Sequence, residues 1–169
     1  MNHDTQPTQS LELPVSDWFK PLAHALILLR EQGYPCVWYG DIYGTKGEEE
    51  FAPSCGGVLH RFILARKLYA YGQQVDYFDH PTCIGWVRYG THDRHAGMAV
   101  LMSSDDADHK RMHVGDMHAG EEWTDVLGWS KKPVVIGKDG YGDFTAGKCS
   151  VSVWVRSDAP GRERFEEKL

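Results

Sequence analysis

The residues most capable of chemistry stand at the start of the chain. Asn2, His3 and Asp4 place an amide, an imidazole and a carboxylate in consecutive positions, and residues 5–7 favour a turn. At the end of a strand, such a cluster can point several polar groups into one pocket. Position alone favours an unstructured polar terminus, because first residues usually fray. The rest of the chain reverses that preference.

Other polar groups are weaker candidates. His92 and His95 could hold a metal, but no third ligand stands nearby in sequence, so a surface turn is favoured. The aspartates at 105, 106 and 108 lack the glycine and distal glutamate of an EF-hand loop, which again favours a turn. The glutamates at 48–50 indicate a solvated loop. We therefore assign no metal ligands, and we find no phosphate-binding loop or catalytic triad pattern.

Composition narrows the class of protein. The 169 residues suffice for one domain or two small ones, and 41% hydrophobic content is typical of a globular protein. A net charge of −6 argues against a nucleic-acid partner, which would require a basic face. The longest strongly apolar stretch, residues 22–29, is too short to span a bilayer, so no membrane partner is expected. Six Trp and eight Tyr suit either a core or a sugar-binding surface.

Cysteine usage bears on the compartment. Cys36, Cys55, Cys83 and Cys149 are widely spaced, without a Cys-x-x-Cys pair. No positively charged, apolar leader precedes them in this sequence, so we expect reduced, partly buried thiols and a cytoplasmic location. A leader encoded upstream of Met1 would change that expectation.

The first half of the chain has the order of helices and strands that is typical of a parallel α/β fold. Apolar residues at helical spacing predict a helix between Ser16 and Gln32, which Pro21 either delays or bends. Residues 34–40 form a bulky run without alternation, which predicts a strand buried on both faces. After a loop at 40–57, a second helix is expected over residues 58–71, ending at Gly72.

The second half has the pattern of antiparallel strands separated by turns. Strands are expected at residues 84–89, 98–103, 110–114, 122–126, 134–136, 142–145 and 150–155. In the last of these, Val151, Val153 and Val155 should face one side and Trp154 the other. A boundary near residues 72–76 therefore separates an α/β part (1–73) from a β module (74–157). Residues 158–169 are charged and expected to be disordered.

Three stretches of sequence resemble the C-terminal part of an alpha-amylase, a retaining glycoside hydrolase, of the liquefying bacterial and intracellular fungal type. Residues 2–7 resemble the fourth signature region of that family, at the end of barrel strand seven. Residues 18–23 and 33–44 resemble helix seven and strand eight. Residues 65–72 and 76–80 resemble the last barrel helix entering the C-terminal β domain. The resemblance implies the C-terminal portion of a (β/α)8 TIM barrel followed by an antiparallel Greek-key β-sandwich.

The same resemblance implies roles for individual residues. Asp4 would stabilise the transition state during hydrolysis of internal α-1,4-glucosidic bonds of starch or glycogen, and His3 and Asn2 would be substrate-binding residues. Retaining hydrolysis also needs a nucleophile and a general acid about 5 Å apart. The family takes both from barrel strands four and five, which this sequence does not contain. We therefore expect a truncated chain that is inactive alone and needs the missing barrel half to act on its α-1,4-glucan substrate.

The family also binds calcium. Near His80, Pro81 and Thr82 the sequence departs from the acidic ligands expected for a calcium ion between barrel and β domain. A different class of function stays open beside the enzyme, namely a noncatalytic β-sandwich that binds carbohydrates or protein partners through exposed Trp and Tyr.

Overall fold

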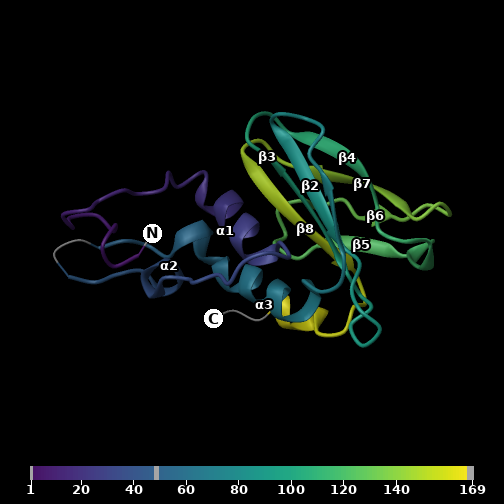
Figure 1. Ribbon diagram of the computed structural model, residues 1–169, viewed down its shortest axis with the longest axis horizontal. Coiled ribbons are helices and arrows are strands. Elements are labelled where there is room, and N and C mark those ends of the chain that lie inside the picture. Colours follow the sequence, from purple (N-terminus) through teal and green to yellow (C-terminus); the bar gives the residue numbers. More distant parts are fainter. Residues whose placement is uncertain (1, 48–49, 167–169) are drawn as a thin grey trace.

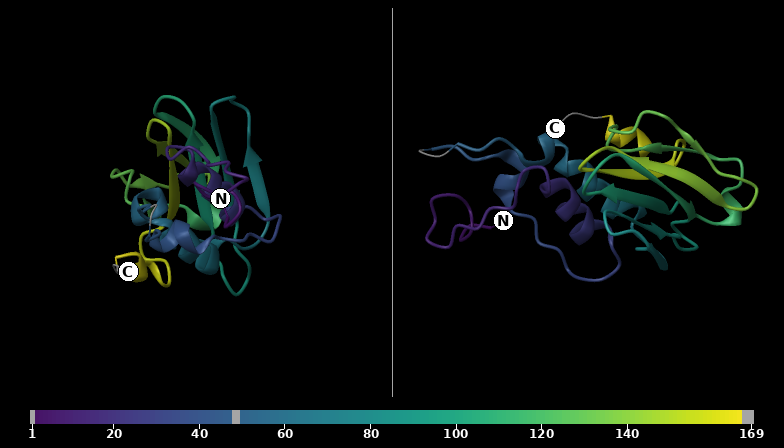
Figure 2. Two further views of the ribbon diagram at one scale, coloured as in Figure 1. Left: turned by 90° about the vertical axis from the view of Figure 1, so that its left-hand side faces the viewer. Right: turned by 90° about the horizontal axis from the view of Figure 1, so that it is seen from above.

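The computed structural model describes residues 2–47 and 50–166 (Figure 1). These residues are arranged in three layers. Two helices cover one face of a six-stranded sheet, and a two-stranded sheet covers the other face. The N-terminal segment projects from the helices on the side away from the strands, in the view of Figure 1 and in that from above (Figure 2). None of the helices in the described part of the chain has the length and apolar character needed to cross a bilayer.

Both predicted helices are present with shorter bounds. Helix α1 spans Lys20–Leu29, and Pro21 stands in its first turn, where a missing N–H costs nothing. The proline therefore delays the helix rather than bending it. Helix α3 spans Leu59–Tyr69 and buries Leu59, Phe62 and Tyr69.

Gly72 shows why the chain turns after α3. Its φ is +77°, and a Cβ at this position would lie 1.7 Å from the carbonyl oxygen of Gly90. Only glycine allows this close approach of the two backbones. The contact ties the segment after α3 to the turn that follows the second strand of the large sheet.

The predicted strand at residues 34–40 is wrong. Residues 34–38 form no regular structure, the Tyr34 side chain is fully exposed, and a short helix, α2 (Tyr39–Tyr43), follows. A strand buried on both faces needs neighbouring strands to bond its backbone groups. Within the described residues, every strand pair lies at residue 74 or beyond, so this run has no sheet to join.

All seven predicted strands of the second half are present. They are β2 (Cys83–Arg88), β3 (Met98–Ser103), β4 (Asp108–His113), β5 (Glu122–Asp125), β6 (Val134–Val135), β7 (Tyr141–Ala146) and β8 (Ser150–Arg156). The large sheet has the order β1-β2-β3-β8-β5-β6, and β4 pairs with β7 in the small sheet. Because β8 returns to lie between β3 and β5, the topology depends on long-range pairing, as in Greek-key sandwiches.

One strand was missed by the sequence pattern. Strand β1 (Gln74–Tyr77) pairs antiparallel with β2 and forms an edge of the large sheet. Its polar residues Gln74 and Asp76 interrupt the apolar run that marks the other strands. An edge strand pairs on one side only, so it tolerates this polarity.

Two apolar clusters fill the spaces between the layers. Val151, Val153 and Val155 pack with the helices in the first cluster, whereas Trp154 lies in the second cluster, between the two sheets. The alternation predicted for residues 150–155 is therefore confirmed. The first cluster joins α1 and α3 to strands β2, β3 and β8, so it crosses the boundary expected near residues 72–76. That boundary itself stays a prediction.

The segment after β8 differs from the expected disordered tail. Residues Arg162–Phe165 form a 3-10 turn, and within the described residues Ser54–Gly57 and Asp116–His118 do so as well. Phe165 is buried and stacks on Tyr69, with ring centroids 6.1 Å apart. Tyr69 Oη also donates a hydrogen bond to the Pro160 carbonyl. One buried aromatic residue thus holds a charged segment to the core; residues 167–169 lie outside the described chain.

Candidate functional site

The residues predicted to do chemistry lie in a turn at the start of the described chain. The side-chain Oδ1 of Asn2 accepts hydrogen bonds from the backbone N–H groups of Asp4 and Thr5, both at 3.0 Å. The Asn2 N–H donates to Thr5 Oγ1 at 3.0 Å. Such bonds from an asparagine to the following backbone close a turn without help from distant residues. Asn2 therefore shapes the turn.

The turn leaves the side chains of His3 and Asp4 exposed on the surface. Their side chains are 82% and 57% exposed, and His3 Nε2 lies 3.3 Å from Asp4 Oδ1. The structure brings these two groups together, but neither lines the pockets described below. Met1 lies outside the described residues, so the predicted position at the end of a strand stays a prediction, as do the assigned roles.

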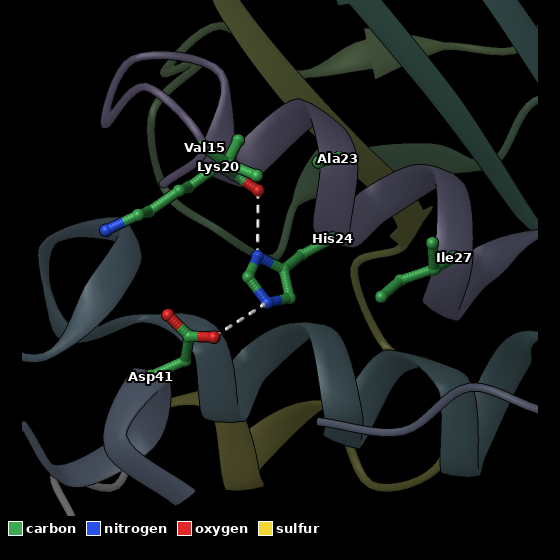
Figure 3. Close-up of a pocket in the computed structure, with 6 residues that line it drawn as sticks. All are labelled: Val15, Lys20, Ala23, His24, Ile27 and Asp41. Atoms are coloured by element: carbon green, nitrogen blue, oxygen red, sulfur yellow. Dashed lines mark hydrogen bonds and ion pairs between the residues drawn. The ribbon is translucent and has the colours of Figure 1, made fainter. Parts of the chain in front are cut away.

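A separate pocket of about 200 Å³ opens beside α1 (Figure 3). Lys20, Ala23, His24 and Ile27 of α1 line it, together with Val15 and with Asp41 of α2. His24 Nδ1 lies 2.8 Å from the Lys20 carbonyl oxygen, and Nε2 lies 3.9 Å from Asp41 Oδ2. Because a carbonyl oxygen can only accept, Nδ1 carries the proton and donates it.

Burial determines the electrostatics of this cluster. Loss of hydration lowers the pKa of His24, so its imidazole is neutral at pH 7. Cys55 Sγ lies 3.7 Å from His24 Nδ1, and burial followed by the charge of Asp41 raises the pKa of the thiol to about 12. Ser54 Oγ donates to Asp41 Oδ1 at 2.5 Å. A thiol with this pKa stays protonated, so the cluster is not an activated Cys-His nucleophile.

The sequence did not point to this cluster. His24, Asp41, Ser54 and Cys55 come from α1, α2 and the 3-10 turn, and 31 residues separate His24 from Cys55. The Gly56-Gly57 pair is the one local signal for this turn, because glycine favours left-handed backbone. In the structure both glycines and Cys55, with a φ of +58°, are left-handed. This run places the thiol against α1. The cluster is a buried polar network that ties together the three helices around the pocket.

The weaker candidates lie on the surface. The side chains of His92 and Asp93 are almost fully exposed in a turn closed by mutual backbone bonds between Thr91 and Arg94. Asp106 pairs with Lys148 at 2.7 Å. Of the glutamates at 48–50, residues 48 and 49 lie outside the described residues. All four cysteines are free thiols.

Near His80, Pro81 and Thr82 the polar groups contact other protein groups, and the expectation about calcium in this region stays a prediction. Asp79 pairs with Lys110 Nζ at 2.5 Å, and Thr82 turns its backbone N–H and its hydroxyl toward His80 Nδ1. Across residues 2–47 and 50–166, no group of three or more His, Cys, Asp and Glu side chains is arranged to hold a metal ion.

Comparison with known proteins places these features in context. The chain is 49% identical over 157 residues to an alpha-amylase of Bacillus licheniformis, an alignment that covers 92% of this chain and 31% of the relative. It is 44% identical over 162 residues to the cytoplasmic alpha-amylase of Escherichia coli (strain K12), covering 91% of this chain and 32% of the relative. No protein-family model matches the chain.

A solved structure shares the fold. The gamma-CGTase from alkalophilic Bacillus clarkii matches with a TM-score of 0.61 and 16% identity, covering 92% of this chain and 25% of that chain. The resemblance inferred from the sequence motifs is therefore confirmed: the chain is similar to the C-terminal part of alpha-amylases. It spans about a third of the length of the curated relatives that it matches.

Proposed function

We propose that this chain acts as the C-terminal part of an alpha-amylase, which hydrolyses internal α-1,4-glucosidic bonds of starch and glycogen with retention of configuration. The observation that carries the proposal is the 49% identity over 157 residues to an enzyme named alpha-amylase. The TM-score of 0.61 over 92% of the chain supports the same fold. The chain spans about a third of its relatives, so the proposal concerns an enzyme to which other segments contribute.

Asp4 is the catalytic residue that this chain supplies. Its carboxylate accepts hydrogen bonds from hydroxyls of the distorted sugar ring, and these bonds strengthen as positive charge develops in the oxocarbenium-like transition state. The exposure of the side chain leaves it accessible to a substrate, and the turn closed by Asn2 fixes its backbone. His3, with Nε2 at 3.3 Å from the carboxylate, contacts the same sugar.

The nucleophile and the general acid come from outside these 169 residues. Retaining hydrolysis uses two carboxyl groups about 5 Å apart, on either side of the scissile bond. A carboxylate that stabilises the transition state has nothing to stabilise without them. The isolated chain therefore does not hydrolyse starch, and it becomes active when the segment carrying the first barrel strands is supplied.

Calcium and location complete the proposal. We infer that calcium of the whole enzyme is held mainly by residues outside this chain; near Asp79 and Thr82 the described side chains contact Lys110 and His80. The enzyme is cytoplasmic, like the relative from Escherichia coli whose name states that location.

Complementation tests the proposal. The 169-residue chain is co-expressed with the N-terminal two thirds of the Bacillus licheniformis relative, and the release of reducing ends from soluble starch is measured. We expect activity from the pair and none from either part alone. Hydrolysis by the purified chain alone would contradict the proposed division of catalytic groups. A stable complex of the two parts without activity would contradict the proposed enzymatic function.

A further inference from the structure

A second pocket, larger than the one in Figure 3, lies at the junction of the helices with the sandwich, apart from the turn that carries Asp4. Its volume is about 500 Å³, within the range of about 300–1,000 Å³ typical of small-molecule sites. The N-terminal end of α1, the loop at residues 51–56 and Trp129 line it. Trp129 belongs to the connection between β5 and β6, so the pocket brings together three segments that are distant in sequence.

Trp129 has the properties of a platform for a flat, partly apolar ligand. The residue is 39% exposed, although tryptophan is usually among the most buried residues. Its ring meets Phe62 of α3 edge to face, at a centroid distance of 6.4 Å, which supports it from the protein side. The remaining surface can stack on the C–H face of a sugar ring, a surface that is apolar although the ring edge is polar.

The polar groups of the pocket favour a neutral ligand with many hydroxyls. Asp17 and Lys20 form an ion pair at 2.8 Å, with side chains 93% and 15% exposed respectively. Together they offer a hydrogen-bond acceptor and a donor with no net charge. Hydroxyl groups both donate and accept, so a saccharide satisfies the two residues at once, whereas a charged ligand gains no net attraction from the neutral pair.

Both walls of the pocket are held in place by buried carboxylates. Asp125 accepts the backbone N–H groups of Trp129 and Ser130, each at 2.9 Å, and is 4% exposed. In the loop at residues 51–56, Ser54 donates a hydrogen bond to Asp41, which is 2% exposed. A site that is already formed binds its ligand without the cost of ordering a loop.

We propose that this pocket is an accessory binding site for α-1,4-glucan chains, in which Trp129 stacks on a glucose ring and Asp17 and Lys20 bond its hydroxyls. The identity of the sugar rests on the proposed function, whereas the site itself rests on the pocket and on Trp129. Its role is to hold the polymer on the enzyme at a distance from the catalytic turn.

The test is affinity electrophoresis of the full 169-residue chain in native gels containing glycogen, with maltoheptaose as the soluble competitor. We expect retardation of the unaltered chain, release by maltoheptaose, and an increase in Kd of about tenfold for Trp129→Ala. Trp129→Phe keeps part of the stacking surface and should bind between the two. The matched control is Tyr141→Ala on β7, because Tyr141 is 37% exposed and does not line the pocket.

Asp17→Ala keeps the test decisive if Trp129→Ala fails to fold, because Asp17 is almost fully exposed and its loss leaves the core intact. Weakened binding by this folded variant supports the site. Absence of retardation of the folded, unaltered chain would overturn the proposal, as would equal binding by the Trp129 and Asp17 variants and the Tyr141 control. Loss of binding in Asp4→Ala would instead place the sugar at the catalytic turn. Binding is measured without hydrolysis, so failed complementation with intact binding contradicts the enzymatic function and leaves this site standing.

Discussion

Replacement of Asp125 should be among the most damaging single changes outside the apolar core. Its Oδ1 accepts the N–H groups of Leu127 at 3.0 Å and Val153 at 2.9 Å, and its Oδ2 accepts those of Trp129 and Ser130. The carboxylate thereby closes the connection after β5 and joins it to β8. In Asp125→Ala, four N–H groups lose their acceptor, those of Leu127 and Val153 in buried bonds and those of Trp129 and Ser130 in part-buried ones.

The expected cost follows from that number of donors. A buried N–H left without an acceptor costs about 1–3 kcal/mol and a part-buried one less, so Asp125→Ala should lower the free energy of unfolding by about 4 kcal/mol. Asp125→Asn keeps one acceptor oxygen and turns an amide toward the other two donors, so about half of that loss is expected. A domain of this size is stable by about 5–15 kcal/mol, so the alanine variant should be close to unfolding.

Urea unfolding followed by circular dichroism measures these differences. The matched control is Asp143→Asn on β7, an exposed aspartate for which a change within about 0.5 kcal/mol is expected. A loss below about 1 kcal/mol for Asp125→Ala would refute the reasoning that this carboxylate satisfies four backbone donors, two of them buried. Folded Asp125→Asn should also bind glycogen more weakly, because the loop that carries Trp129 loses two anchors.

Three further predictions concern His24, Phe165 and calcium. The pKa of His24 is lowered in the folded chain. As the pH falls below about 6.5, the imidazole therefore takes up a proton in the unfolded chain but not in the folded one. The free energy of unfolding should thus be full above that pH and decrease below it. His24→Leu should reduce that decrease in urea titrations at about pH 7.5 and 5.5; an unchanged pH dependence would contradict the assignment. Phe165→Ala should lower the free energy of unfolding by about 3 kcal/mol, because it removes a buried ring. An unchanged Tm would show that this ring does not hold the C-terminal segment to the core. EDTA should leave the Tm of the chain unchanged, whereas a clear decrease would place a structural metal within it.

The sequence predicted the strands of the sandwich because their information is local. Residues 98–103 and 150–155 are dense in β-forming side chains, and the alternation around Trp154 assigns each face to a different apolar cluster. The turn at Asn2 is also local, since a side chain bonds the next few backbone groups. The role proposed for Asp4 came from resemblance to a family, not from geometry.

What the sequence could not predict depends on contacts between distant segments. The run at 34–38 has the composition of a buried strand, but a strand forms only where neighbours accept its hydrogen bonds. The pocket at Trp129 needs a loop of the sandwich to meet residues 17–20 and 51–56, and no local pattern specifies that meeting. Phe165 lies in a charged segment whose composition indicates disorder, and its burial against Tyr69 reverses that expectation.

The most direct test of the central claim is the turnover of the complemented enzyme when Asp4 is replaced. We expect Asp4→Asn to lower kcat on soluble starch by about a hundredfold or more, with a much smaller change in KM, because the lost hydrogen bonds are strongest in the transition state. The control is Asp93→Asn, an exposed aspartate in the turn between β2 and β3, which should leave kcat unchanged. Equal kcat values for the unaltered and the Asp4→Asn complexes would contradict the account, because Asp4 would then have no part in catalysis.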